Sequence, residues 1–206
     1  MLVANGLECL RGERRLFRDV GFELEPGTLL EVLGANGSGK TSLLRMLCGL
    51  LAPAAGEILW NGAGIGALGE AYRGELAYLG HQNAIKHDLT AIENLLVSET
   101  LAEAAVTRAS AREALARLGL RGHDELPTRV LSQGQKRRAA LARLLFRERC
   151  RLWVLDEPFA ALDAQAVRDV AGIITGQLGG GGIVVCTTHQ EVSVAAPKRV
   201  ALRLGR

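Results

Sequence analysis

GANGSGKT, residues 34–41, stands between the apolar run TLLEVLG and a helical spacing of leucines. The pattern G-x-x-x-x-G-K-[ST], placed between a buried strand and a helix, is typical of a loop that binds phosphate groups. Its glycines let the backbone wrap closely around phosphate oxygens, and the N–H groups at a helix start bind anions. Lys40 supplies a positive charge for the β and γ phosphates of a nucleotide, and the Thr41 hydroxyl can bind Mg²⁺. The predicted nucleotide-binding residues are Gly34, Ala35, Asn36, Gly37, Ser38, Gly39, Lys40, Thr41 and Ser42.

Apolar runs of strand length alternate with helical patterns along the chain. The strands are predicted over residues 2–10, 20–24, 28–34, 56–60, 75–80, 151–155 and 182–188, with RGERR at residues 11–15 as a turn. Helices are predicted after the phosphate loop, over residues 90–118 and over residues 161–178. RLWVL and GIVVCTT are continuous apolar or β-branched runs, as in strands buried on both faces of a parallel sheet. The sequence therefore predicts an α/β fold with right-handed crossovers and a helix-rich subdomain in the middle.

Two carboxylates follow the predicted strand in LWVLDEP, residues 152–158. Asp156 would lie at the carboxyl edge of the sheet beside the phosphate loop, where it can hold Mg²⁺ directly or through water. Glu157 would point toward the γ phosphate and polarise the attacking water as a general base. A solvated acidic pair that opens a loop before Pro158 is the simpler alternative, and it fits an isolated Asp-Glu better than one in a chain with a phosphate loop.

Two further polar residues follow predicted strands. Gln82, in YLGHQNAIK, can reach Mg²⁺ or the attacking water through its amide, and His189, in VVCTTHQ, can hydrogen-bond the γ phosphate. Taken alone, each is more typical of an ordinary loop. Their position after strands of the same sheet adds Gln82 and His189 to Glu157 as predicted catalytic residues. The predicted metal ligands are Thr41, Gln82 and Asp156.

LSQGQ, residues 131–135, begins another predicted helix. Ser132 and Gln135 fit a capping box, which is sufficient to start a helix. The backbone N–H groups at this helix start, with Ser132 and Gly134, would also form a second anion-binding helix terminus. A second phosphate site in a chain with one phosphate loop implies a second chain.

Composition limits the remaining classes. The chain has 206 residues, 48% hydrophobic and 23% charged, with a net charge of +3. These values indicate one soluble globular unit. The sequence has no dense Lys/Arg arm of the kind that would indicate a nucleic-acid partner. Four widely separated cysteines lack metal-site spacing and are predicted to be small core residues in a reducing compartment. No signal peptide or membrane-spanning run is evident, so a cytosolic chain is predicted, with any membrane role supplied by a partner.

With these motifs in this order, the sequence resembles the nucleotide-binding subunit of ABC transporters over essentially all 206 residues. The resemblance implies a P-loop NTPase fold in one domain, residues 1–206. This domain would have a RecA-like parallel core, a small antiparallel β subdomain and a helical subdomain at about residues 83–140. It also implies ATP, Mg²⁺ and a head-to-tail dimer. In that dimer Ser132, Gly134 and Gln135 would bind the γ phosphate of ATP held by the other subunit, and Asp163, in AALDA, would contact that subunit.

Two positions depart from the family pattern. Gln133 stands where the signature has its first glycine, so only Gly134 keeps a close backbone approach, and activity is expected to survive. Many members stack an aromatic side chain on adenine, whereas spacing from Lys40 places Arg11 there and Phe17 in the core. Adenine is therefore expected to stack on the Arg11 guanidinium or to be held weakly.

A narrower resemblance lies in GHQNAIK, LTAIENL, DEPFAALD and GGGIVVCTTHQ. These segments resemble the ATPase of the cytochrome c maturation (Ccm) system, long described as a haem exporter. This resemblance implies integral membrane permease subunits as partners and a peripheral position on the cytoplasmic face of the bacterial inner membrane. Whether haem is moved, or ATP is used to release a haem-loaded chaperone, stays open at this point.

Three other functions compete with this interpretation. An ABC ATPase for a different exported substrate would have the same cassette. A soluble ABC ATPase that acts on nucleic acid or ribosomes usually carries a coiled-coil insertion or a second cassette, and this chain has neither. A small P-loop kinase would leave LSQGQ and TTH unexplained and would require an Arg-rich lid.

Overall fold

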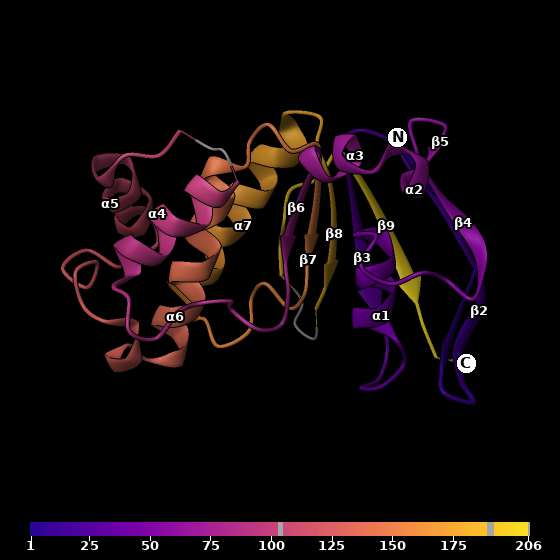
Figure 1. The fold of residues 1–206 in the computed structure, drawn as a ribbon, viewed down its shortest axis with the longest axis horizontal. Helices are drawn as coiled ribbons and strands as arrows, with labels where there is room; N and C mark the ends of the chain where they lie inside the picture. The colour runs from indigo at the N-terminus through magenta and orange to yellow at the C-terminus, as the bar shows by residue number, and fades with distance from the viewer. Residues whose placement is uncertain (103–104, 189–191, 206) are drawn as a thin grey trace.

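A computed structural model of the chain describes residues 1–102, 105–188 and 192–205. Two sheets and several helices form an α/β structure (Figure 1). In chain order the elements are β1 (Leu2–Arg11), β2 (Arg14–Leu24), β3 (Thr28–Leu33), α1 (Lys40–Leu47), β4 (Ala55–Trp60), β5 (Ala63–Gly64), α2 (Ile65–Leu68), α3 (Glu70–Gly74), β6 (Leu76–Leu79), α4 (Ala91–Leu101), α5 (Arg108–Arg117), η1 (Thr128–Val130), α6 (Gln133–Leu141), η2 (Ala142–Phe146), β7 (Leu152–Leu155), α7 (Ala164–Gly179), β8 (Ile183–Thr187) and β9 (Lys198–Arg203).

The central sheet is parallel, with strand order β6-β7-β8-β3-β9. Side chains of β7 alternate between its two faces, and all of them are buried. Trp153 and Leu155 pack with α7 and the helices beyond it, whereas Leu152 and Val154 pack with α1 on the opposite face. This burial on both faces explains why the strand is a continuous apolar run.

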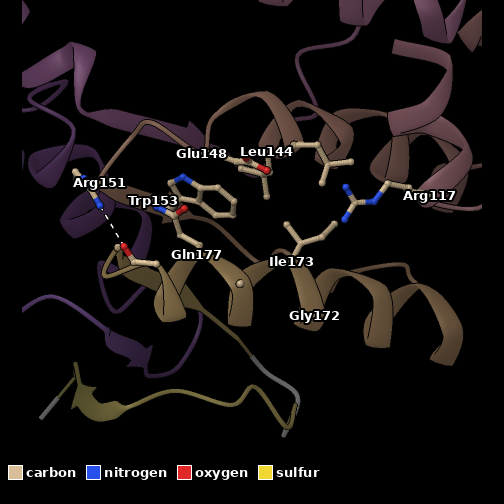
Figure 2. A pocket seen from close by; sticks show the side chains of 12 residues that line it. Arg117, Leu144, Glu148, Arg151, Trp153, Gly172, Ile173 and Gln177 are labelled. Atoms are coloured by element: carbon tan, nitrogen blue, oxygen red, sulfur yellow. Dashed lines mark hydrogen bonds between the residues drawn. The ribbon is translucent and has the colours of Figure 1, made fainter. Parts of the chain in front are cut away.

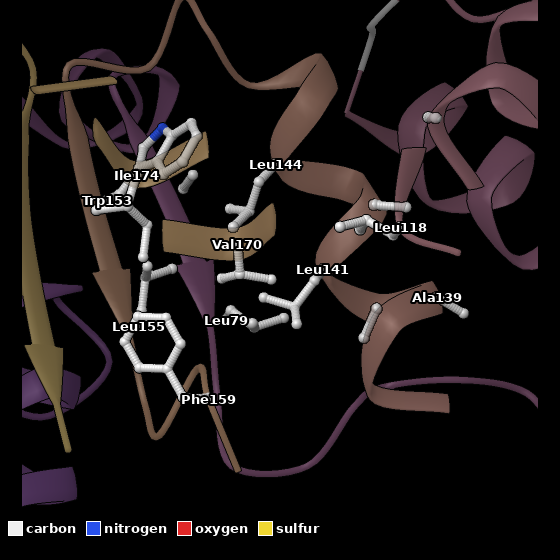
Figure 3. Close-up of a cluster of buried hydrophobic side chains, with 14 of the residues drawn as sticks. Leu79, Leu118, Ala139, Leu141, Leu144, Trp153, Leu155, Phe159, Val170 and Ile174 are labelled. Carbon is white, nitrogen blue, oxygen red and sulfur yellow. The ribbon is translucent and has the colours of Figure 1, made fainter. Parts of the chain in front are cut away.

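The hydrophobic core therefore has two parts, one on each face of the parallel sheet. Figure 3 shows the first part, where Trp153, Leu155 and Phe159 meet Val170 of α7 and Leu141 near the end of α6. The second part lies between the parallel sheet and an antiparallel sheet of order β2-β1-β4-β5. Figure 1 accordingly shows helices α4 to α7 on one side of the parallel sheet and the antiparallel sheet on the other.

The first hairpin is longer than the sequence predicted. Strand β2 begins at Arg14 rather than at residue 20, and the predicted RGERR turn is reduced to the two residues between β1 and β2. Gly12 has a φ of 61°, which a tight turn requires, and Arg11 pairs directly with Arg14. The first part of β2 was not predicted because it carries charged side chains on its solvent face. Backbone pairing does not require apolar residues there.

One other prediction about secondary structure was wrong, and one strand was not predicted. The helix predicted over residues 90–118 is two helices, because Thr107 and Ser110 form a capping box that starts α5 anew. Strand β9 was not predicted; it lies at an edge of the parallel sheet, and most of its side chains are exposed. An edge strand rich in Lys and Arg lacks the apolar signal of its buried neighbours.

The strand order brings the predicted site residues to one edge of the sheet. β3, β6, β7 and β8 are parallel members of this sheet, so their carboxyl ends lie on the same side. The phosphate loop follows β3, Gln82 follows β6, and Asp156 follows β7. The four cysteines are free and buried, as predicted, and burial raises the pKa of Cys48 and Cys186 to about 12. Within the described ranges, no helix is long and apolar enough to cross a membrane.

Candidate nucleotide site

The phosphate loop is shaped by glycines in backbone conformations that other residues rarely adopt. Gly34, Gly37 and Gly39 have φ values of 150°, 79° and 100°. A Cβ at Gly34 would lie 2.6 Å from the Leu204 carbonyl oxygen, and one at Gly39 would lie 2.9 Å from the Phe17 ring. Nothing lies within 4 Å of a Cβ built at Gly37. Packing therefore requires glycine at the two ends of the loop, whereas its middle faces open space.

The basic and hydroxyl groups of the loop face inward. Lys40 is only 7% exposed, and its Nζ donates hydrogen bonds to the carbonyl oxygens of Gly34 at 2.7 Å and Ala35 at 3.1 Å. Within the described part of the chain, the buried Ser38 Oγ has no hydrogen-bond partner. A buried hydroxyl without a partner is unfavourable, so the loop is arranged to hold a group that can accept or donate a hydrogen bond.

Asp156 connects three segments that are distant in sequence. Its side chain is 2% exposed; Oδ2 accepts a hydrogen bond from Thr41 Oγ1 at 2.9 Å, and Oδ1 accepts one from Thr187 Oγ1 at 2.7 Å. The structure thus brings together two of the three predicted metal ligands, Thr41 and Asp156. Carboxylate and hydroxyl oxygens suit Mg²⁺, which usually binds one or two carboxylates together with substrate phosphates.

Glu157 is held in a conformation that is unusual for its residue type. Its φ is 49°, in the left-handed region, and its N–H donates to Thr187 Oγ1 at 2.8 Å. Its Oε2 lies 3.7 Å from Nδ1 of His81, an exposed residue that the sequence reasoning missed. The only signal for His81 was its place beside Gln82 in GHQ.

A cavity of about 560 Å³ lies over the phosphate loop. It brings together seven of the predicted site residues with His81 and with Arg11, the residue expected near adenine. Its lining is Arg11, Leu16, Asn36, Gly37, Gly39, Lys40, Thr41, Ser42, His81 and Glu157. Phe17 is buried in the core, as predicted.

Gln82 does not line this cavity. It lines a neighbouring one of about 540 Å³, together with His87, Gln133 and Lys136. The predicted catalytic residue His189 lies outside the described residues. The structure therefore places Glu157 with the phosphate loop but sets Gln82 beside the start of α6.

The LSQGQ segment forms the predicted capping box. Ser132 Oγ accepts from the Gln135 N–H at 3.1 Å, and Gln135 Oε1 accepts from the Ser132 N–H at 2.9 Å. A Cβ at Gly134 would lie 2.7 Å from the Ala161 carbonyl oxygen. Within the chain, Gly134 therefore packs closely against the loop before α7, where a side chain would not fit.

Asp163 caps α7 and ties it to α6. Its Oδ1 accepts from the Ala166 N–H at 2.8 Å, and its Oδ2 pairs with the Arg138 guanidinium at 2.5 Å. The Ala166 N–H, with a smaller contribution from Arg138, lowers the pKa of Asp163 from its ordinary value. Asp163 and the LSQGQ residues Ser132, Gly134 and Gln135 do not line the cavity over the phosphate loop.

Another cavity, of about 340 Å³, opens at the opposite end of β7, near Arg151 and Trp153 (Figure 2). Gln177 and Ile173 of α7 and the side chain of Arg117 also line it. None of the predicted site residues lines it, and it lies at the amino ends of the parallel strands. Ligands of such sheets bind at the carboxyl ends, which favours the cavity over the phosphate loop as the nucleotide site.

Comparison with known proteins gives consistent matches. The ABC transporter family profile matches residues 17–160. The chain is 55% identical to a cytochrome c biogenesis ATP-binding export protein CcmA of Dechloromonas aromatica, with 100% of both chains covered. It is 56% identical to the protein of the same name in Nitrosomonas europaea, with 93% of this chain and 90% of that one covered.

Solved structures match over the same length. A putative ABC transporter ATP-binding protein of Pyrococcus furiosus is 25% identical, with a TM-score of 0.82 over 98% of this chain and 96% of that chain. A dimeric ATP-binding cassette in a post-hydrolysis state, bound to ADP and phosphate, is 22% identical, with a TM-score of 0.82 over 100% of this chain and 97% of that chain. The second likeness is evidence for the fold.

Proposed function

The chain belongs to the ABC transporter family, together with the CcmA cytochrome c biogenesis ATP-binding export proteins, and on this premise we propose how it uses ATP. It has the α/β P-loop NTPase fold and is an ATP-hydrolysing subunit. The proposal is that hydrolysis energises integral membrane subunits in c-type cytochrome biogenesis, for haem export or for release of a haem-loaded chaperone. The chain would act as one nucleotide-binding domain, with residues 83–140 as its helical subdomain, at the cytoplasmic face of the bacterial inner membrane.

One observation carries the catalytic proposal: Thr41 and Thr187 converge on Asp156, beside Lys40 and the cavity that Glu157 lines. Thr41 and Asp156 would hold Mg²⁺, with Gln82 reaching it when its loop moves. When bound, the ion would neutralise charge on the phosphates. Lys40 would compensate the charge of the γ phosphate in the transition state.

Hydrolysis would use Glu157 as the general base. Glu157 accepts a proton from water while the water oxygen attacks the γ phosphorus, and the bond to the bridging oxygen of ADP breaks. His189 would donate a hydrogen bond to the γ phosphate. The products are ADP and inorganic phosphate, and their release would reopen the site.

Two copies would close head to tail around two ATP molecules. Ser132, Gly134 and Gln135 of one copy would contact the γ phosphate held by the other, because α6 begins with N–H groups suited to an anion. Asp163 would lie at the contact between the copies. A cassette of this fold is described as a dimer bound to ADP and phosphate, which supports a dimer of this chain. Closure would reach the membrane subunits through the region from Gln82 to Val97.

The cellular role can be tested in a bacterial strain that lacks its own copy of this gene. The wild-type chain is expected to restore covalently haem-stained c-type cytochromes, and the Lys40→Ala variant is expected to fail at equal protein level. Affinity purification of the wild-type chain from native membranes is expected to bring down integral membrane proteins. Normal c-type cytochromes in the strain without the gene would overturn the assignment and favour a different exported substrate.

Replacement of Arg11 by alanine is expected to weaken ATP binding. Arg11 lines the nucleotide cavity, and in the described part of the chain no hydrogen bond or ion pair holds its guanidinium. Loss of a cation–π contact of about 1 kcal/mol corresponds to roughly a fivefold rise in Kd. Titration calorimetry with ATP and GTP measures both affinity and base preference.

Arg14→Ala is the control for Arg11→Ala. Arg14 is the strand partner of Arg11 in the same hairpin and does not line the cavity. Its removal is expected to leave nucleotide binding unchanged. If Arg11→Ala also leaves ATP affinity and base preference unchanged, adenine does not stack on Arg11.

A further inference from the structure

Arg137 joins two segments of the catalytic edge from within α6. Arg137 is buried, with only 4% of its surface exposed. Nη1 donates to the Gly80 carbonyl oxygen at 3.2 Å and to Asn83 Oδ1 at 3.0 Å, on either side of Gln82. Nη2 donates to the carbonyl oxygens of Asp156 at 2.7 Å and Glu157 at 2.8 Å. One buried guanidinium thus contacts both the Gln82 loop and the backbone of the two catalytic-edge carboxylates.

The Glu157 backbone depends on such contacts. A non-glycine residue with a φ of 49° persists only where its surroundings over-determine it. The Thr187 hydroxyl accepts the Glu157 N–H on one side, and Arg137 donates to the Asp156 and Glu157 carbonyl oxygens on the other. Without Arg137 these carbonyl oxygens would lose a charge-assisted hydrogen bond, which is stronger than a neutral one. The Glu157 N–H bond to Thr187 and the turn contact from the Ala160 N–H to the Glu157 carbonyl oxygen would remain.

Arg137 also lies within α6, the helix that Ser132 caps. The Arg137 guanidinium lies about one turn beyond the start of α6. Because a helix transmits displacement along its axis as a rigid element, a shift of the start of α6 would also move this guanidinium. We infer that Arg137 is a positioning residue that ties the position of α6 to the orientation of Glu157 and of the Gln82 loop. The inference rests on the proposed function, in which Glu157 is the base and α6 meets the nucleotide of a second copy.

The test compares Arg137→Met with the wild-type chain. Methionine fills similar space and removes all four hydrogen bonds, and Arg137 is not itself among the residues that line the nucleotide cavity. Misplacement of a catalytic group by about 1 Å can lower the rate roughly 100-fold, so kcat is expected to fall by about 10- to 100-fold. The Kd for ATP without Mg²⁺, measured by calorimetry, is expected to be unchanged. A conservative Arg137→Lys variant keeps one donor group and is expected to recover part of kcat.

Arg143→Met is the matched control. Arg143 is another largely buried arginine; it donates to the Asn83 and Ala140 carbonyl oxygens but has no hydrogen bond to Asp156 or Glu157. Its loss is expected to lower thermal stability much as Arg137→Met does, with kcat close to wild type. An equal loss of kcat in both variants at equal Tm would overturn the inference, because the effect would then be general destabilisation.

The outcomes separate this inference from the function on which it rests. An inactive wild-type chain contradicts the proposed function itself. An active wild type, an inactive Glu157→Gln and a fully active Arg137→Met contradict only the role of Arg137. If Arg137→Met does not fold, Arg137→Lys decides: a lowered kcat with unchanged Kd supports the inference, and wild-type kcat overturns it.

Discussion

Glu157→Gln is expected to bind ATP and to hydrolyse it at least about 100-fold more slowly than the wild-type chain. Glutamine keeps the size of the side chain, and the Glu157 N–H bond to Thr187 at 2.8 Å does not involve the carboxylate. The backbone with its φ of 49° should therefore persist. What is lost is the group that accepts the proton from water. Phosphate release under saturating ATP and Mg²⁺ measures the turnover.

The same variant should also make the dimer observable. If hydrolysis reopens the dimer, a chain that binds ATP without hydrolysing it should accumulate as the closed form. Size-exclusion chromatography with light scattering is expected to give a dimer in ATP and Mg²⁺, and a monomer in ADP. For the wild-type chain, the dimer should be transient in ATP.

Glu148→Gln serves as the control for Glu157→Gln. Glu148 is exposed and lines the cavity at the other end of β7, and its replacement by glutamine removes the same charge. Its replacement is expected to change neither turnover nor the elution profile. A Glu157→Gln monomer that hydrolyses ATP at the wild-type rate would contradict both the general base and the head-to-tail dimer.

The parallel sheet was predictable from sequence because its central strands are buried on both faces. β7 and β8 are wholly buried, so every residue in them is under the same selection for apolar character. The edge strand β9 has no such constraint on its exposed side chains and carries Lys198, Arg199 and Arg203. Its existence depends on pairing with β3, which is a tertiary property.

The phosphate loop was predictable because its geometry depends on residue type at fixed spacing. Gly34 and Gly39 occupy backbone conformations and close contacts that exclude a side chain, so their sequence signal is strong. Asp156 was recognised for a related reason: an acidic residue directly after a buried strand is uncommon unless it has a partner. Thr41 and Thr187 are those partners in the structure.

Arg137 and His81 could not be predicted in the same way. Arg137 stands in a helix rich in basic residues, QGQKRRAAL, where the sequence does not distinguish a buried arginine from an exposed one. Its four acceptors come from two other segments, 19 to 57 residues away in sequence, and only folding brings them together. Likewise, the contact of His81 with Glu157 joins the ends of two neighbouring strands.

Asp156→Asn is expected to abolish the dependence of nucleotide affinity on Mg²⁺ and to reduce ATP hydrolysis by at least about 100-fold. Asparagine has the shape of aspartate, and its Oδ1 can still accept from Thr187. The Thr41 hydroxyl can rotate to accept from the new amide, so both hydrogen bonds have a partner. The free energy of unfolding should therefore change by no more than about 1 kcal/mol, whereas the negative charge that would bind the ion is gone.

Calorimetric titration with ATP, with and without Mg²⁺, separates the loss of a metal ligand from a loss of fold. For the wild-type chain, Mg²⁺ is expected to tighten ATP binding; for Asp156→Asn, the two titrations should coincide at the metal-free affinity. Asp124→Asn is the matched control, because Asp124 is also buried and accepts from Arg112 at 2.9 Å, but it lies in the helical region. That variant should lose stability while keeping the full effect of Mg²⁺. If Asp156→Asn still binds ATP more tightly with Mg²⁺, the ion is held by other groups, and the hydroxyl–carboxylate bridge between Thr41 and Asp156 is structural.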